Sequence, residues 1–422
     1  MTDHDTSWKK TFFLVWTGQA FSIIGSSAAQ FALLWWLTLQ TGSPLVLAMA
    51  GIAGFLPQAL LGPIAGVWID RLSRKTVMIA ADFFIAGVSA ILAVAFLAGT
   101  PEAWLIYLIL FLRAIGSVFH APAMQAAMPL LVPPSELVRT GGWGQFLSSG
   151  SLMLGPVLGT LLMTRFSVPA VLAIDILGAA IAALTLVAVK LPDPESDPNA
   201  TPHLLRELRE GLGEVLGNRA LMAVTLPVLL TTLFYVPVSS LFPLMVNSHF
   251  GGSAWHASAV EFLFAGGMLV SSLILGVWGG LKNPFTMIAL SLGVLGLALT
   301  GSGLLAPSGI LAFAGLSFVM GMTGSFFGVP FFAFIQGAVP PERLGRVISL
   351  LTSLMSFAIP VGLFVAAPIA ERTGIAAWFS ISGVLIVLSA GLGYVMTRDL
   401  PPPTPAPQPN AQTETTPRTT SG

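Results

Sequence analysis

Five ionisable side chains lie inside long apolar stretches of this sequence. They are Asp82, Arg113, His120, Asp175 and Glu261. An unpaired charge inside a bilayer is costly, so such residues are rare there and usually functional. Arginine keeps its charge, whereas a carboxyl or an imidazole can gain and lose a proton. A fixed cation beside a titratable group is the minimum that coupling to protons requires, and we predict these five residues as candidates for it.

Depth along the helices predicts which of these groups meet. Arg113 and His120 are seven positions apart, which places them on one helix face, about 10 Å apart along the axis. Asp175 falls at about the depth of Arg113 and Asp82 near that of His120, whereas Glu261 falls in the first turn or so of its helix. If the helix of Asp175 packs too far away, Asp82, water or backbone carbonyls would serve Arg113 instead. Purely structural ion pairs, and for Glu261 a side chain that reaches out to water, are the alternatives.

The elements that must position these residues are membrane-spanning helices. Hydrophobic residues make up 55% of the 422 residues and charged residues only 9%, far from the composition of a soluble domain. About 20 apolar residues cross a bilayer core. Twelve nearly uncharged stretches reach that length: 12–39, 43–68, 77–98, 103–131, 143–164, 168–189, 220–247, 258–280, 285–305, 308–338, 347–370 and 374–397. We therefore predict an all-α integral membrane protein with twelve transmembrane helices.

The two halves of the chain repeat one another. The segment Val132–Arg139 returns, with changes, as Val339–Arg346, about half the chain length later. A second pair, Ala65–Trp68 and Leu275–Trp278, lies at nearly the same offset. Two copies of one hydrophobic module predict two pseudo-symmetric six-helix bundles. In membrane proteins such an arrangement usually forms a transporter with its site between the halves.

Basic residues predict the orientation. With the N-terminus inside, most of the 18 Lys and Arg residues fall in cytoplasmic segments, and only Arg113 lies mid-span. We predict a multi-pass protein of the cell membrane with both termini cytoplasmic and no cleavable signal peptide. The predicted regions are a cytoplasmic N-terminus (1–11), an N-terminal bundle (12–189), a cytoplasmic linker (190–219), a C-terminal bundle (220–397) and a disordered cytoplasmic tail (398–422).

The linker contains a predicted amphipathic helix. Thr201 would cap it, with Pro202 at its first position, and leucines would form one face opposite the charged residues. Such a helix can lie on the inner membrane surface, although a strap that joins two domains is the simpler interpretation. Cysteine is absent from the chain, which excludes disulfides and thiolate metal sites. We expect neither a metal nor a cofactor.

A charged motif follows the second span. Gly66, Asp70, Arg71, Arg74 and Lys75 have the spacing Gly-x-x-x-Asp-Arg-x-x-Arg-Lys, which resembles a signature of the major facilitator superfamily. Gly66 would allow a close helix approach, and Asp70 would interact with a helix end or a basic group of the opposite half, so that the cytoplasmic side closes. The basic residues would also enforce the topology. The second-half copy lacks the acid, which predicts an asymmetric gate.

Span five contains a glycine and proline motif. Gly155, Pro156 and Gly159 form Gly-Pro-x-x-Gly, which is similar to a motif of exporters in the same superfamily. Small residues let helices pack closely, and Pro156 removes a backbone hydrogen bond and bends the span. Span eleven has an equivalent bend at Pro360 and Gly362. A generic kink would explain the proline alone, but the full motif favours export.

Uncharged polar and aromatic residues fall on the spans that would line a central cavity. Most aromatic side chains in such a protein face lipid or packing partners. As a set, however, they suit a large, mostly apolar ligand held by few hydrogen bonds. The candidates are Gln19, Phe21, Gln30, Phe119, Gln145, Phe234, Tyr235, Phe326, Phe327 and Gln336.

Longer segments resemble the macrolide-efflux group of the major facilitator superfamily, of the drug:proton antiporter type. The similarity runs from about Trp8 to about Arg398 and is close at Arg113–Pro122, whose arginine motif is similar to that of proton-coupled drug antiporters. This resemblance implies the major facilitator fold and export of macrolide-like antibiotics by proton antiport with alternating access. Siderophore or metabolite export by the same fold, and proton-coupled import, are the alternatives.

Other classes of protein fit the sequence less well. An enzyme would need a catalytic cluster, whereas the five histidines are scattered. A pump driven by nucleotide hydrolysis would need a Gly-x-x-x-x-Gly-Lys-Ser/Thr loop, which the sequence lacks. A channel would need neither paired halves nor a gate. The expected partners are a small-molecule substrate, protons and the lipid bilayer, without nucleic acid. We expect a monomer, and a partner ATPase or accessory protein stays open.

Overall fold

The fold is entirely helical in the residues that the structure describes. A computed structural model describes residues 7–69, 72–191 and 204–400. Within these ranges, twelve helices are long and apolar enough to cross a membrane. The predicted all-α fold with twelve spans is therefore confirmed.

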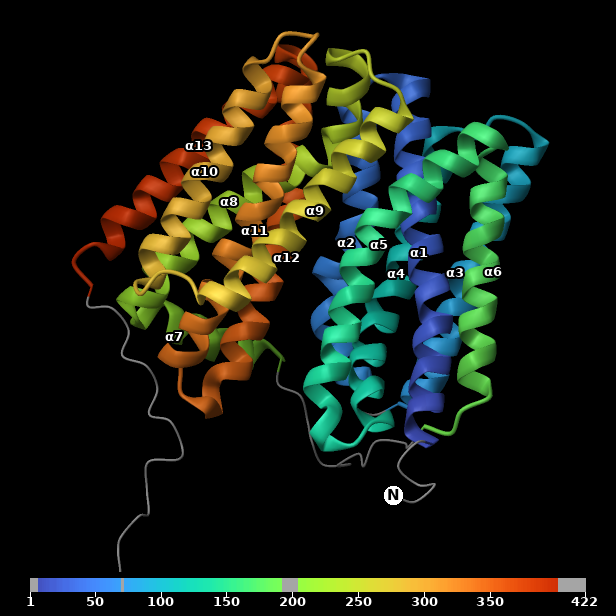
Figure 1. The fold of residues 1–422 in the computed structure, drawn as a ribbon, viewed down its shortest axis with the longest axis horizontal. Coiled ribbons are helices and arrows are strands. Elements are labelled where there is room, and N and C mark those ends of the chain that lie inside the picture. Colours follow the sequence, from blue (N-terminus) through green and yellow to red (C-terminus); the bar gives the residue numbers. More distant parts are fainter. Residues whose placement is uncertain (1–6, 70–71, 192–203, 401–422) are drawn as a thin grey trace, which may run out of the picture.

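Six helices form the N-terminal half. They are α1 (Ser7–Thr41), α2 (Pro44–Ile69), α3 (Arg74–Ala98), α4 (Ala103–Ala127), α5 (Leu137–Arg165) and α6 (Val168–Val187). Two short 3-10 turns, Met128–Leu131 and Pro134–Glu136, connect α4 to α5. In Figure 1 these helices stand side by side as one bundle, with the N-terminal end of α1 at the bottom.

The C-terminal half adds a short helix and six long ones. They are α7 (Leu204–Gly217), α8 (Arg219–Leu244), α9 (Ala254–Trp278), α10 (Pro284–Leu304), α11 (Ile310–Ala338), α12 (Pro341–Thr373) and α13 (Ile375–Thr397). A π-helical turn, Met245–His249, continues α8. Helix α7 lies at the bottom of this second bundle in Figure 1. We call this the linker end of the molecule and the opposite one the far end.

Local signals set several helix boundaries. The Asn218 side chain accepts hydrogen bonds from the backbone of Ala220 and Leu221 and so caps α8. Gly279 follows α9 in the left-handed conformation, with φ of 76°, where a glycine is favoured. The predicted cap and first position of the linker helix, Thr201 and Pro202, lie outside the described residues.

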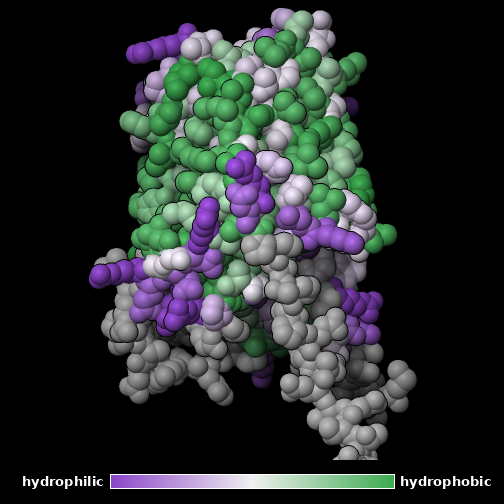
Figure 2. Space-filling model, turned by 90° about the vertical axis from the view of Figure 1, so that its left-hand side faces the viewer, coloured by the Kyte–Doolittle hydropathy of each residue, from purple (hydrophilic) through white to green (hydrophobic). Residues whose placement is uncertain are grey.

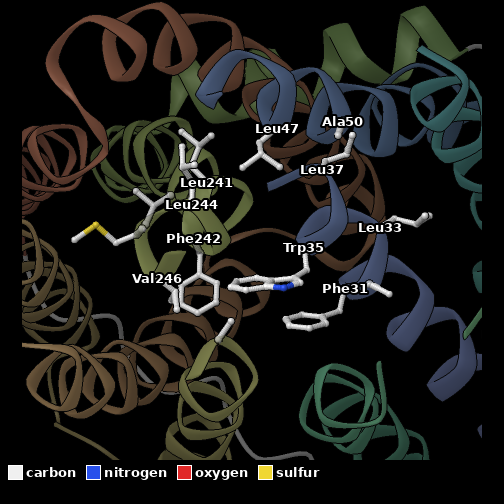
Figure 3. Packing of buried hydrophobic residues seen from close by; sticks show 14 of the residues in the cluster. Phe31, Leu33, Trp35, Leu37, Leu47, Ala50, Leu241, Phe242, Leu244 and Val246 are labelled. Carbon is white, nitrogen blue, oxygen red and sulfur yellow. The ribbon is translucent and has the colours of Figure 1, made fainter. Parts of the chain in front are cut away.

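The two halves share one hydrophobic core at the far end. There Trp35 of α1 and Phe242 of α8 point toward one another, with Leu47 of α2 beside Leu241 (Figure 3). Three hydrogen bonds also join the halves among the described residues. Glu371 accepts two of them, from Ser43 Oγ at 3.1 Å and from the backbone N–H of Leu45 at 3.3 Å, and Thr160 donates the third to the carbonyl of Ala254 at 3.3 Å.

At the linker end each half has its own core. One cluster includes Phe12, Met78 and Leu186 of the N-terminal half. The other includes Leu221 and Val347 of the C-terminal half. The halves are thus packed together at the far end and have separate cores at the linker end.

The outer surface is apolar over most of its height. Figure 2 shows hydrophobic residues covering the visible face, while hydrophilic residues gather toward its lower part. Long apolar side chains such as Leu97, Val277 and Leu311 are 77%, 93% and 85% exposed. Such a surface is stable only when lipid covers it. The chain is therefore a multi-pass membrane protein.

Helix α7 packs against α12. Gly211 allows this approach, because a Cβ there would lie 2.9 Å from the carbonyl oxygen of Arg346. Val215 is buried in the linker-end core of the C-terminal half, whereas Leu212 and Leu216 are exposed. Glu210 bonds to Arg346 at 2.5 Å and Glu214 to Arg343 at 2.7 Å. Helix α7 is thus held against the C-terminal half.

Candidate functional site

Four helices meet at a buried ion pair in the N-terminal half. The guanidinium of Arg113 on α4 contacts the carboxylate of Asp175 on α6, and the two residues are 7% and 0% exposed. Asp175 also accepts hydrogen bonds from Ser26 Oγ of α1 at 2.7 Å and from Ser89 Oγ of α3 at 2.8 Å. The Ser89 hydroxyl in turn accepts a hydrogen bond from Arg113. Each charge is therefore compensated, as burial inside a membrane protein requires.

Small residues bring these helices close enough for the contact. At Gly25 of α1, an added Cβ would lie 3.2 Å from the backbone of Asp175. At Gly116 of α4, it would lie 2.6 Å from the Ile85 side chain of α3. Glycine at such crossings lets backbones approach, and a serine then reaches across. This explains why the short side chain of Ser26 can bind Asp175.

A second pair lies nearer the linker end. His120 Nε2 of α4 is 3.3 Å from Asp82 Oδ1 of α3, without the alignment of a hydrogen bond. Asp82 is 2% exposed, and the Ser22 hydroxyl of α1 lies 3.5 Å from the same oxygen. The second carboxylate oxygen of Asp82 has no hydrogen-bond partner among the described residues. This pair is therefore less completely satisfied than the pair of Arg113 and Asp175.

A cavity of about 550 Å³ reaches the pair of Asp82 and His120 from the linker end, whereas Arg113 and Asp175 do not line it. Asp82, His120, Ser22 and Ser26 all line it. Ser22 and Ser26 lie one turn apart on α1, the first beside Asp82 and the second bonded to Asp175. The cavity is roomy enough for water and has polar groups in its wall. It can thus connect solvent to the carboxyl group of Asp82 and to Ser26, the hydrogen-bond partner of Asp175.

A smaller cavity of about 230 Å³ lies in the C-terminal half toward the far end. Helices α8, α9, α11 and α13 supply most of its wall, and Leu152 of α5 contributes from the other half. Five of its lining residues are aromatic, and Glu261 is the one carboxyl among them. The other lining residues of the C-terminal half are Tyr235, Val238, Ser239, Phe242, Val260, Phe264, Ala265, Phe313, Ser317, Met320 and Phe379.

The position of Glu261 corrects the sequence prediction. It was expected in the first turn or so of its helix, but α9 begins at Ala254 and places Glu261 about two turns inside. The reason is a capping box at the start of α9. The Ser253 side chain accepts a hydrogen bond from the backbone N–H of His256, and the His256 ring accepts one from the backbone N–H of Ser253, so the helix begins early. Glu261 therefore lines an internal cavity instead of the membrane surface.

Few of the predicted cavity residues line these two cavities. Gln145 lines the linker-end cavity and bonds to Ser149 at 3.2 Å, and Tyr235 lines the smaller one. Gln19 is fully buried, with no hydrogen-bond partner for its amide among the described residues. Phe21 is 56% exposed. The remaining candidates also line neither cavity: Gln30, Phe119, Phe234, Phe326, Phe327 and Gln336.

The described part of the charged motif acts within one half. Arg74 donates to the carbonyl of Ala126 at 3.1 Å, near the end of α4. Lys75 donates to the carbonyls of Val187 and Val189, at 3.1 and 2.7 Å, at the end of α6. Both cations thus bind the last carbonyls of helices in their own bundle. Gly66 lies in α2, and Asp70 and Arg71 lie outside the described residues.

The glycine and proline motif lies where α5 crosses α1. A Cβ at Gly155 would collide with Ser27, and one at Gly159 would lie 2.7 Å from the carbonyl of Ala28. Pro156 is inside α5. In the other half, Gly362 of α12 meets the backbone of Leu233 on α8 in the same way. Both halves therefore use glycine at equivalent crossings, next to the far-end contact between them.

Comparisons with known proteins agree with this architecture. The family model described as Major Facilitator Superfamily matches residues 15–308 and 238–421. Macrolide efflux protein A from Streptococcus pyogenes is 40% identical over 386 residues, which cover 91% of this chain and 95% of that protein. Macrolide efflux protein A from Enterococcus faecalis is 40% identical over 324 residues, which cover 76% of this chain and all of that protein.

A solved structure shows the same fold. A bacterial homologue of the human lysosomal transporter Spinster, in an inward-facing and unoccupied conformation, matches with a TM-score of 0.71 and 12% identity over 93% of this chain and 97% of that one. The predicted resemblance to this superfamily is confirmed. The prediction that the protein is a transporter and not an enzyme agrees with the family. The chain belongs to the Major Facilitator Superfamily of membrane transporters and is related to the macrolide efflux proteins.

Proposed function

We propose that this protein is a secondary active exporter of amphipathic, mostly apolar small molecules, with macrolide-like antibiotics favoured, and that it exchanges them for protons by alternating access. The relation to macrolide efflux protein A supports export and its substrate class. The buried pair of Arg113 and Asp175, whose hydrogen-bond partner Ser26 lines the linker-end cavity, carries the proposal of proton coupling. The exporter acts as a monomer in the cell membrane.

The linker end faces the cytoplasm in this proposal. Basic residues gather there, including Arg139, Lys282, Arg343 and Arg346, as the positive-inside rule demands of cytoplasmic segments. Both termini are then cytoplasmic. Because the halves have separate cores at that end and a shared core at the other, the conformation described here corresponds to one open toward the cytoplasm.

In this proposal, protons bind to and leave Asp175 in its ion pair with Arg113. Arg113 stays charged in either state. When Asp175 takes a proton, the attraction that holds α4 to α6 weakens, and the balance between conformations changes. A change of ~1.4 kcal/mol alters the ratio of two conformers tenfold. Asp82 and His120 lie beside the same cavity and pass protons between it and Asp175.

The charged motif after α2 serves as the cytoplasmic gate. Asp70 follows α2 in the sequence, and α2 packs against α12 of the other half. In this proposal Asp70 binds that half when the linker end closes. Asp70→Asn should slow transport in proteoliposomes while leaving membrane insertion normal. A wild-type rate in that variant would contradict the gate.

Transport by the purified protein tests the proposal. Proteoliposomes and inverted membrane vesicles should accumulate or release a macrolide in response to an imposed pH gradient, and a protonophore should abolish the response. The direction relative to the gradient separates export from import. Transport that ignores the pH gradient but follows a sodium gradient would contradict proton antiport.

A further inference from the structure

Glu261 is partly buried and lies on the face of α9 that packs inward. It is one turn from Ala257 on one side and from Ala265 on the other, which are 0% and 2% exposed. Its carboxyl lines the cavity of about 230 Å³. Among the described residues, no hydrogen-bond donor or basic side chain is paired with it. Glu261 is therefore an acid without a protein partner inside the C-terminal half.

The four helices that supply most of the wall offer Glu261 no lysine or arginine nearby. In sequence, α9, α11 and α13 contain no Lys or Arg, and in α8 the only one is Arg219, at its linker-end start. An isolated carboxylate in apolar surroundings is costly, so it has to be neutral or to find a cation from outside. The N-terminal half meets the same requirement internally at Asp175, which is paired with Arg113. In the C-terminal half, the position of such a counter-ion beside Glu261 is left open.

The wall of the cavity suits an organic cation. Tyr235, Phe242, Phe264 and Phe313 contribute aromatic side chains to it, of which Phe242 and Phe313 stack on one another, and aromatic rings attract cations. The volume is below the roughly 300–1,000 Å³ of a site for a whole drug-sized molecule. It therefore fits one arm of a larger ligand. Because Leu152 of α5 closes part of the wall, that arm would touch both halves.

We infer that Glu261 and this cavity form a recognition site for the protonated basic amine of a lipophilic substrate, with the carboxylate as the counter-ion and the aromatic wall around the alkyl groups. The inference rests on the proposed function, since the amine belongs to the exported molecule. It assigns cation recognition to the C-terminal half and leaves proton coupling to the N-terminal half.

A matched pair of probes tests the inference. N,N-dimethyl-1-naphthylmethylamine carries a basic amine, and 1-(methoxymethyl)naphthalene is a neutral ether of similar shape. Binding is measured by calorimetry on purified protein in detergent at neutral pH, without any gradient. The amine should bind about tenfold more tightly than the ether, as a charge-assisted hydrogen bond predicts. In Glu261→Gln this preference should fall to roughly twofold or less, while affinity for the ether is unchanged.

Two further variants separate charge from shape. Asp399→Asn removes the same charge at an exposed site near the linker end and should keep the full preference for the amine. Ala265→Leu narrows the cavity without removing the carboxyl and should weaken both probes. A melting curve of each variant confirms that it is folded.

Several results would overturn the inference. The first is equal affinity of the wild-type protein for both probes. The second is a preference for the amine that survives in Glu261→Gln. The third is a loss of pH-driven transport of a neutral substrate in Glu261→Gln. The last would make Glu261 a proton carrier. Because binding needs no gradient, failure of proton antiport would leave the amine preference intact, and the two proposals fail separately.

Discussion

The two halves of this transporter treat buried charge in different ways. The N-terminal half holds Arg113 with Asp175 and His120 with Asp82, beside a cavity of about 550 Å³. The C-terminal half holds Glu261 without a partner among the described residues, in an aromatic cavity of about 230 Å³. The halves come from one repeated module and share its helix packing. Their chemistry has diverged, so that one half balances its own charges and the other leaves a charge for a ligand.

Removal of Arg113 should have the largest effect. Arg113→Ala leaves Asp175 buried without a cation, and we expect proton-driven accumulation to be abolished. Arg113→Lys keeps the charge but loses the planar guanidinium, whose Nη1 contacts both Asp175 and Ser89, so it should keep part of the activity. Transport is measured in proteoliposomes with an imposed pH gradient, and ligand binding in detergent should survive in both variants.

A double variant separates coupling from stability. A single loss from a buried pair destabilises by about 3–5 kcal/mol, whereas removal of both charges is often neutral. Arg113→Ala with Asp175→Asn should therefore recover thermal stability but not proton-driven transport. If transport returns together with stability, the pair is only a structural strut and the contrast between the halves loses its functional meaning.

The pair nearer the linker end should matter less. His120→Gln keeps a polar side chain beside Asp82 but cannot carry a proton, and we expect transport to fall about tenfold, equivalent to ~1.4 kcal/mol in the barrier. The rate should also depend less steeply on pH, because the variant lacks a side chain that can pass a proton. Initial rates at a fixed pH difference measure this. An unchanged pH profile would show that protons reach Asp175 without His120.

The sequence predicted the fold well and the site in part. Twelve apolar stretches of bilayer length leave little freedom to a chain in lipid, and depth along the helices correctly suggested that Asp175 lies beside Arg113. The sequence missed Ser22, Ser26 and Ser89, because serine is common in spans and only the packing of α1 and α3 brings its hydroxyl to a carboxylate. It also missed that Glu261 is internal, because apolar composition alone did not locate the start of α9. Most aromatic candidates line neither cavity, since hydrophobicity does not tell a cavity wall from a packed or lipid-facing surface.

Glycine variants test whether the halves share their packing. Gly155→Ala in the N-terminal half and Gly362→Ala in the C-terminal half each place a methyl group against a neighbouring helix. Overpacking of this kind costs about 1–3 kcal/mol, so both should lower the melting temperature. Gly150→Ala and Gly328→Ala are the matched controls, because a Cβ at either position meets open space and alanine favours a helix. Unequal losses at Gly155 and Gly362 would show that the packing has diverged as well.

The smallest effect is expected at the repeated segment itself. In the first copy, Arg139 pairs locally with Glu136 at 3.7 Å, whereas in the second copy Arg343 and Arg346 bind α7. Helix α7 is thus attached to the C-terminal half through the second copy. Among the described residues, the first copy has only the local pair of Arg139 and Glu136. These ion pairs are largely exposed, and each is worth about 0.2–1 kcal/mol. Glu210→Gln with Glu214→Gln should therefore barely change the melting temperature, but hydrogen exchange along α7 should become faster, while Glu136→Gln leaves α7 unchanged. If the double variant instead stops transport, α7 takes part in the conformational cycle, and the difference between the two copies is functional as well as structural.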